Sequence, residues 1–462
     1  MKTTPMRLYS PLVLLAIALA GGCKKFVTVP PPASLMVGPT AFESDANAIS
    51  TMTGLYSEIM NSGTQFAASG TTLYCSLASD ELVNYTPGVR DEFSANQLTL
   101  SSHSTLESVF WTPAYNYIYT ANAILEGVAG SKNISPPVRQ MLTGEAKLMR
   151  AFCYFHLVNI FGGVPLVLQT DFNLNANLPR AESSVVYRQM ITDLGEAENL
   201  LPAIYTSAER TRPNKWTATA LLARIYLYQG KWDSAALLSA KLIHSGNYDL
   251  ATTPASVFLK SSNETIWQLQ PVNPAYNTYE GNFILPATAL SVPTYIFRNT
   301  FTSDFEVNDL RKLSWVGVRS YQSQQYSYPA KYKVYGNNAP VTEYYIILRL
   351  AEQYLIRAEA LAQQDQLALA LADVNVIRMR AGLPALAMPL SKAQILLIIE
   401  KERRSELFAE WGHRWFDLKR TGRANAVLSA MKPATWQPTD VLWPVPDNQL
   451  KANPALTQNP GY

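Results

Sequence analysis

Residues Gly144 to Pro165 read GEAKLMRAFCYFHLVNIFGGVP, and this stretch decides the fold. Leu148, Phe152 and Phe155 recur at helical spacing and form an apolar stripe. Further apolar side chains occupy much of the remaining circumference, so a helix here must be covered by other elements on several sides. Gly162 and the glycine after it end the helix because glycine readily adopts positive φ, and the closing proline prevents continuation. The stretch therefore predicts a buried helix with a sharp end.

Helical periodicity recurs on both sides of this stretch. Segments 217–244 and 345–380 each predict two antiparallel helices, with small and aromatic residues at tetratricopeptide-like offsets. One such hairpin cannot bury its own apolar face, so several must stack. We therefore predict an all-α fold of tetratricopeptide-like helical hairpins that form an α/α superhelix, with pairs within about 40–250 and 340–420. Single helices are predicted at 44–60, around 111–124 and at 187–202.

A segment between the helical hairpins has a different composition. Residues 276–335 contain 13 aromatic side chains, and helical periodicity is absent there. Pro, Asn, Ser and Gly interrupt the segment repeatedly. A loop-rich region of this length is unusual in a compact domain unless it has a function. We therefore predict a loop-rich, ligand-binding insertion at about 270–340.

Several motifs resemble the SusD/RagB family of surface lipoproteins, which capture nutrients for an outer-membrane transporter of Bacteroidetes. The first is the stretch at 144–165, and the second is E-R-R-S-E-L…E-W-G-H-R-W-F-D-L-K-R at 402–420, in which Trp411 and His413 replace more usual residues. The third is L-W-P-V-P at 442–446. The resemblance runs from Cys23 to the C-terminus, and it implies one SusD-like domain over residues 40–462.

The N-terminus has the pattern of an export signal. Pro11 to Ala20 is an apolar run too short to span a bilayer, and small residues precede Cys23. We predict a lipoprotein signal peptide at 1–22, lipidation of Cys23, and a proline-rich spacer at 23–39. Ala20 stands where lipoprotein signals usually have Leu, which leaves ordinary secretory cleavage as the alternative. The resemblance implies an outer-membrane anchor facing the cell exterior, and display in the periplasm is the other possibility.

Composition and residue spacing give no indication of a metal or cofactor site. The net charge of +3 gives no indication of nucleic acid, and the four histidines occur at no metal-ligand spacing. We expect no metal and no cofactor. Cys153 reads as a small core residue, although a disulfide between Cys75 and Cys153 is an alternative in an oxidising compartment.

Three carboxylates, Glu402, Glu406 and Glu410, fall on one helical face. Paired carboxylates hydrolyse glycosides, but such pairs normally face a sugar from different elements. Neighbouring cations can neutralise this acidic run instead, namely Arg403, Arg404, Arg414 and Lys419. We therefore expect a structural ion-pair network and no enzyme activity.

The candidate ligand residues fall into two groups. Aromatic faces suit the apolar C–H faces of sugar rings, while polar side chains suit their hydroxyl groups. The aromatic candidates are Tyr276, Tyr279, Tyr295, Trp315, Tyr321, Tyr326 and Tyr328, and Asp80, Asn84 and Arg90 are the polar ones. The resemblance separately implies Asp80, Arg90 and Trp111 from their positions near family motifs. Irregular core packing is the alternative role for these aromatic residues, and we accept it for most phenylalanines of the segment.

The resemblance implies a protein that binds an oligosaccharide and presents it to a SusC-like TonB-dependent transporter. Three alternatives remain open at this point. The cargo could be an oligopeptide, as in RagB-like members, although the low charge and high tyrosine content of the segment at 276–335 favour sugar. The chain could also be a secreted α-helical glycosidase, or a periplasmic scaffold without a small ligand.

Overall fold

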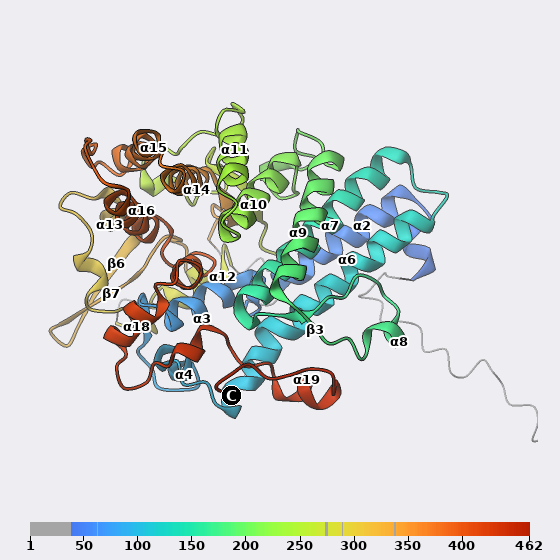
Figure 1. The fold of residues 1–462 in the computed structure, drawn as a ribbon, viewed down its shortest axis with the longest axis horizontal. Helices are drawn as coiled ribbons and strands as arrows, with labels where there is room; N and C mark the ends of the chain where they lie inside the picture. The colour runs from blue at the N-terminus through green and yellow to red at the C-terminus, as the bar shows by residue number, and fades with distance from the viewer. Residues whose placement is uncertain (1–37, 62, 273–275, 289, 337–338) are drawn as a thin grey trace, which may run out of the picture.

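The computed structural model describes residues 38–61, 63–272, 276–288, 290–336 and 339–462. The predicted signal peptide, Cys23 and most of the spacer lie outside these residues. Helices dominate the fold, and the strands form four two-stranded sheets within the described part of the chain (Figure 1). No helix in the described ranges is long and apolar enough to cross a membrane.

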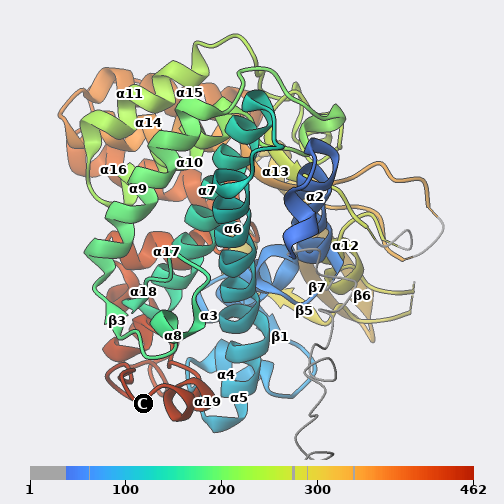
Figure 2. The same ribbon diagram turned by 90° about the vertical axis from the view of Figure 1, so that its right-hand side faces the viewer.

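The predicted central helix is α7, Pro136–Phe161. It is buried along most of its length from Leu142 onward, and it ends at Gly162, which has φ +75°. Helices α6 (Thr112–Gly130) and α9 (Ser183–Leu200) pack against it, and α2 (Asp45–Asn61) contacts both α6 and α7 (Figure 2). Because other helices pack against α7 on several sides, its own residues are apolar around most of its circumference. The predicted helix and its end are confirmed.

Helical hairpins continue from this bundle in a stacked series. α10 (Lys215–Tyr228) packs on α9 and on α11 (Trp232–Ile243), and α11 packs on α14 (Leu350–Gln363). α14 in turn contacts α15 (Leu367–Arg380) and α16 (Lys392–Leu407). A buried ion pair between Arg224 and Glu352, with Nε and Oε1 2.6 Å apart, joins α10 to α14. The all-α prediction of stacked tetratricopeptide-like hairpins is confirmed, with the long insertion leaving the array between α11 and α14.

The second predicted hairpin begins differently from the prediction. Tyr345–Arg349 forms the strand β8 rather than the first turn of a helix. It pairs antiparallel with β4 (Thr265–Leu269), and every residue of both strands is buried. A short, fully buried apolar run has no alternation that would distinguish a strand from a helix. Pairing with a distant segment therefore decided the conformation here.

The insertion is more ordered than predicted. Strand β5 (Tyr295–Phe297) pairs with β1 (Leu82–Asn84), and β6 (Val316–Tyr321) and β7 (Gln324–Pro329) form a hairpin. The two turn residues between β6 and β7 both have positive φ, as a type I′ hairpin turn requires. These residues are Gln322 and Ser323, which lack the Asn-Gly signature of such turns, so the sequence did not reveal the hairpin. Figure 1 shows it projecting from the body below α13 (Leu310–Trp315).

The remaining elements are short. They are the helices α3 (Thr71–Ala78), α4 (Arg90–Ala95), α5 (Leu100–Thr105), α8 (Phe172–Asn175), α12 (Tyr279–Ile284), α17 (His413–Arg420), α18 (Ala424–Met431) and α19 (Asp447–Ala452), the π-helices at Phe66–Gly70 and Leu106–Trp111, and the strand pair β2 (Val164–Pro165) and β3 (Arg180–Ala181).

Two glycines provide a matched test of the packing at the end of α7. A Cβ at Gly163 would lie 2.5 Å from the carbonyl oxygen of Ala181 on β3, whereas one at Gly195 in α9 would have no neighbour within 4 Å. Gly163→Ala is expected to lower the free energy of unfolding by about 1–3 kcal/mol through this clash. Gly195→Ala is expected to raise it by about 0.5–1 kcal/mol, because alanine favours the helix. Urea unfolding of both variants checks the pair, and equal effects would contradict the packing described.

Candidate functional site

A cleft of about 480 Å³ opens beside the loop that joins β1 to α4. The pairing of β1 with β5 builds it by setting Asn84 opposite Tyr295, and the backbone N–H of Tyr85 extends this pairing to Thr294 O at 2.8 Å. The lining therefore comes from segments far apart in the sequence. It consists of Tyr74, Asn84, Thr86, Pro87, Gly88, Val89, Arg90, Thr105 and Thr294.

Internal hydrogen bonds hold the loop of the cleft in place. Asp91 accepts from Asn84 Nδ2 at 3.0 Å and from the backbone N–H of Gly88 at 2.9 Å. Asn84 Oδ1 is buried and has no hydrogen-bond partner among the described residues. A buried acceptor without a partner costs free energy unless a ligand or water satisfies it. The cleft wall therefore contains an acceptor suited to a ligand hydroxyl.

Arg90 is the charged residue of the cleft lining. Its guanidinium lies over the Tyr295 ring, 5.8 Å from the ring centre. Burial raises the pKa of Tyr295 to about 12, and the Arg90 cation opposes part of that rise. Arg90 makes no hydrogen bond or ion pair with any residue in the described ranges, and its Nε is buried. The side chain is thus positioned by an aromatic contact, and its Nε has no partner among the described residues.

Aromatic side chains adjoin the loop of the cleft. Tyr85 is 42% exposed and packs edge-on against Tyr326 of β7, with ring centres 5.2 Å apart. Tyr321 is half-buried at the end of β6, next to the hairpin turn. Tyr85 was missed in the sequence, although it directly follows Asn84 and so lay within the same phrase. Its exposure could not be read from its residue type.

Asp80 was predicted as a ligand residue, but the structure places it in a buried ion pair with arginines that do not line the cleft. It is 2% exposed and accepts from Arg414 through both oxygens, at 2.7 and 2.8 Å. Burial would raise the pKa of Asp80, but Arg414 and Arg404 lower it below its ordinary value. Its carboxylate is fully engaged by these arginines, which removes it from the ligand surface.

Two predicted tryptophans also lie in the core. Trp111 is 4% exposed and packs against Tyr115 and Phe161. Trp315 is 0% exposed, and its Nε1 donates to Pro254 O at 2.8 Å. Neither ring presents a face to solvent, so both belong to the irregular core packing that was the alternative role for these aromatic residues.

The remaining candidates divide between the cleft and other places. Tyr279 begins α12 and Tyr276 lies just before it, with their ring centres 5.5 Å apart. Neither residue lines the cleft. Tyr328 lies in β7, opposite Gly317 of β6. The structure therefore brings four of the predicted residues together at the cleft and its edge, namely Asn84, Arg90, Tyr295 and Tyr326.

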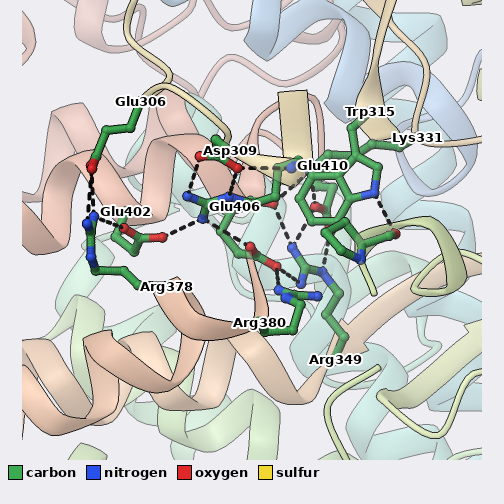
Figure 3. A network of polar contacts seen from close by, with 12 residues as sticks. Glu306, Asp309, Trp315, Lys331, Arg349, Arg378, Arg380, Glu402, Glu406 and Glu410 are labelled. Atoms are coloured by element: carbon green, nitrogen blue, oxygen red, sulfur yellow. Dashed lines mark hydrogen bonds and ion pairs between the residues drawn. The ribbon is translucent and has the colours of Figure 1, made fainter. Parts of the chain in front are cut away.

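The acidic run forms the predicted ion-pair network. Glu406 pairs with Arg349 at 2.6 Å and with Arg311 at 3.3 Å, and it also contacts Arg380. Glu402 pairs with Arg311 at 2.5 Å, and Glu410 accepts from Arg349 Nε at 2.8 Å. Figure 3 shows the three carboxylates in a row with cationic partners around them.

The partners of these carboxylates differ from the predicted ones. Arg403 pairs with Asp417, with Nε and Oδ2 2.8 Å apart, and Arg414 pairs with Asp80, while Lys419 donates to Asn159 O. The cations that neutralise the acidic run instead come from the insertion, from β8 and from α15, namely Arg311, Lys331, Arg349, Arg378 and Arg380. These ion pairs therefore join the insertion to α16 and to the residues just after it.

The two cysteines of the described chain are free thiols. Cys75 and Cys153 are both buried and are not joined to each other. Burial raises the pKa of both thiols. Cys153 is thus the small core residue that the sequence indicated.

Comparison with known sequences identifies the family. A sequence model described as "Starch-binding associating with outer membrane" (SusD-like) matches residues 39–227, and a model of the SusD family (SusD_RagB) matches residues 308–462. The chain belongs to the SusD/RagB family. It is 25% identical to SusD-like protein P25 of Formosa agariphila over 95% of this chain and 96% of that protein. It is 28% identical to SusD-like protein P2 of the same organism, over 82% and 84% of the two chains.

Solved structures of SusD-like proteins have the same fold. A SusD superfamily protein of Bacteroides vulgatus aligns with a TM-score of 0.80 at 19% identity, over 91% of this chain and all of that one. A laminarin-binding SusD-like protein aligns with a TM-score of 0.75 at 24% identity, over the same shares. At these identities the likeness concerns the fold. The cleft lies partly outside both sequence models, since its lining residue Thr294 falls between residues 227 and 308.

Proposed function

We propose that this SusD-like protein is an outer-membrane lipoprotein that captures an oligosaccharide for a SusC-like TonB-dependent transporter. The observation that carries the proposal is the cleft beside the β1–α4 loop. Its lining contains Asn84 and Arg90, whose Oδ1 and Nε atoms have no partner among the described residues, and the exposed ring of Tyr85 belongs to the same loop, between Asn84 and Thr86. Rings supply flat apolar contact for a sugar, and the polar atoms supply hydrogen bonds that fix its orientation.

Anchoring at the membrane is part of the same proposal. Cys23, after a signal peptide at 1–22, would carry acyl chains, and the spacer at 23–39 would separate them from the folded body. The family description of outer-membrane association supports this location. The stacked hairpins would contact the transporter, and exposed apolar residues such as Leu237 on α11 and Leu369 on α15 offer apolar surface for it.

A structural role rather than hydrolysis is proposed for the three carboxylates of the acidic run. Glu402, Glu406 and Glu410 are buried among cations. The nitrogen atoms of these cations lie within 3.6 Å of the carboxylate oxygens. Glycoside hydrolysis needs two carboxylates that face a sugar across its scissile bond. The acidic run is enclosed in the protein, so it supports the fold rather than a reaction.

Removing the exposed ring at the cleft is expected to weaken glycan binding. Tyr85→Ala should lower the affinity about 5-fold, because a lost aromatic contact costs about 1 kcal/mol. Calorimetric titration of the full-length protein in non-ionic detergent measures this, with glycan oligosaccharides of several linkages and a pool of short peptides as ligands. Tyr119→Ala is the matched control, since Tyr119 is 47% exposed but lies on α6 and not in the β1–α4 loop.

The result separates the alternatives. Loss of glycan affinity in Tyr85→Ala but not in Tyr119→Ala supports capture at this cleft. Binding of peptides without any response to glycans would replace the sugar with the oligopeptide alternative. Glycan binding that both variants retain would move the site elsewhere on the protein.

A further inference from the structure

Arg90 differs from the other buried arginines of this protein in having no polar partner. Thirteen arginines of the described residues pair with carboxylates, namely Arg150, Arg212, Arg224, Arg311, Arg349, Arg357, Arg378, Arg380, Arg403, Arg404, Arg414, Arg420 and Arg423. Arg180 and Arg210 instead donate to backbone carbonyls. Arg90 is half-buried and makes neither kind of contact with the described residues. Its guanidinium therefore has no carboxylate or carbonyl partner among the described residues.

No carboxylate of the described residues forms an ion pair with Arg90. No acidic residue lines the cleft. The two carboxylates nearest in sequence have other partners, since Asp91 holds Asn84 and Gly88, and Glu92 accepts from Thr99 N and Oγ1 at 2.9 Å. A partly desolvated guanidinium in such a place favours an anionic ligand.

A second arginine near the cleft is also without a carboxylate. Arg298 follows β5, and its Nη2 donates to Ser94 O at the end of α4, 3.0 Å away. It forms no ion pair within the described part of the chain, and its Nε is buried without a partner. Burial lowers the pKa of Arg298 and the Asp80 carboxylate opposes part of that fall, so the charge of Arg298 is partly balanced and Arg90 remains the unpaired cation of the cleft among the described residues.

We propose that the cleft selects an acidic glycan, with Arg90 binding a uronate carboxylate or a sulfate ester. This inference rests on the proposed glycan-binding function and adds its substrate class. Arginine presents a planar fork of donors that matches an oxyanion. Asn84 lines the same cleft, and its Oδ1 lacks a donor, which a hydroxyl of the same sugar ring could supply. One cleft thus offers a donor set for the anion and an acceptor for its neighbouring hydroxyl.

The test compares charged and neutral ligands on the full-length protein in non-ionic detergent. The probes are oligomers of galacturonate, their methyl esters, κ-carrageenan oligosaccharides and laminarin oligosaccharides, titrated by calorimetry. De-esterified galacturonate or sulfated carrageenan is expected to bind on the order of 10- to 100-fold more tightly than the neutral probes. The two acidic probes distinguish a carboxylate from a sulfate, and added salt should weaken the binding of either.

Variants connect the charge preference to this side chain. Arg90→Gln should remove the preference for the acidic probe, and Arg90→Lys should retain part of it. Arg188→Gln is the matched control, because Arg188 is exposed on α9 and outside the cleft. Arg90 makes no structural hydrogen bond, so Arg90→Gln is expected to fold, and the comparison of methyl ester with free acid needs no variant.

The outcomes separate the inference from the function beneath it. Neutral probes that bind as tightly as acidic ones, or acidic binding that Arg90→Gln leaves intact, would overturn the inference while the glycan-binding function stands. No binding to any glycan would overturn both. Binding of acidic peptides in place of acidic glycans would also overturn the inference.

Discussion

Replacing Glu406 with glutamine is expected to destabilise the protein by about 3–5 kcal/mol. Glu406 is 0% exposed and lies among Arg311, Arg349 and Arg380. Burial would raise its pKa, but the surrounding cations lower it below the ordinary value of a glutamate, so the carboxylate is ionised. The amide is neutral, and it leaves the three guanidinium groups buried with too little negative charge.

The measurement is the free energy of unfolding from urea titration at neutral pH. Glu196→Gln is the control, because Glu196 is 50% exposed in its ion pair with Lys147. Its loss should cost between about 0 and 1 kcal/mol. A Glu406→Gln protein as stable as the control would refute a structural role for the network, and the acidic run would then need another explanation.

Trp315→Ala is expected to cost about 3–5 kcal/mol of stability through the loss of a large buried ring. The indole is 0% exposed, and Lys331 Nζ lies 4.7 Å from its ring centre. Phe258 packs edge-on against it at 5.6 Å between ring centres. Alanine would leave a cavity at the junction between the insertion and the ion-pair network, and the surrounding residues can fill it only in part.

The same variant separates packing from ligand contact. Urea unfolding should show the loss, while glycan affinity, measured under conditions in which the variant is folded, should stay close to that of the unaltered protein. Tyr335→Ala is the aromatic control, since Tyr335 is 41% exposed, and it should change stability by less than about 1 kcal/mol. Full stability combined with lost glycan binding would return Trp315 to the list of ligand residues.

Long helices were predictable from the sequence because their evidence is local. α7, α9 and α10 each carry many apolar positions and clear end signals within one continuous stretch. The errors concern short segments whose conformation depends on distant partners. Tyr345–Arg349 forms a strand because it pairs with β4. This pairing joins segments far apart in the chain, so local residue patterns do not reveal it.

The candidate site was predictable only in part for the same reason. Asn84 and Arg90 were found because they follow a recognisable phrase, and Tyr295 and Tyr326 were found from composition. Composition does not show which aromatic side chains are exposed. The sequence therefore could not reveal that Trp315 is buried while Tyr85 is exposed. The pairing of β1 with β5, which creates the cleft, joins segments separated by most of the helical array.

The insertion leaves the helical array after α11 and returns at α14, and these two helices pack against each other. Its ends are therefore held close together by the scaffold, so a change in its length adds little closure entropy. A relative could exchange the whole ligand-facing module while keeping the same spine. The exchange has one condition, because Arg311 and Lys331 belong to the module and neutralise Glu402, Glu406 and Glu410 in α16 and just after it. A grafted module must contain equivalent cations, because otherwise the buried carboxylates at α16 would be left unpaired and the module would not pack against them.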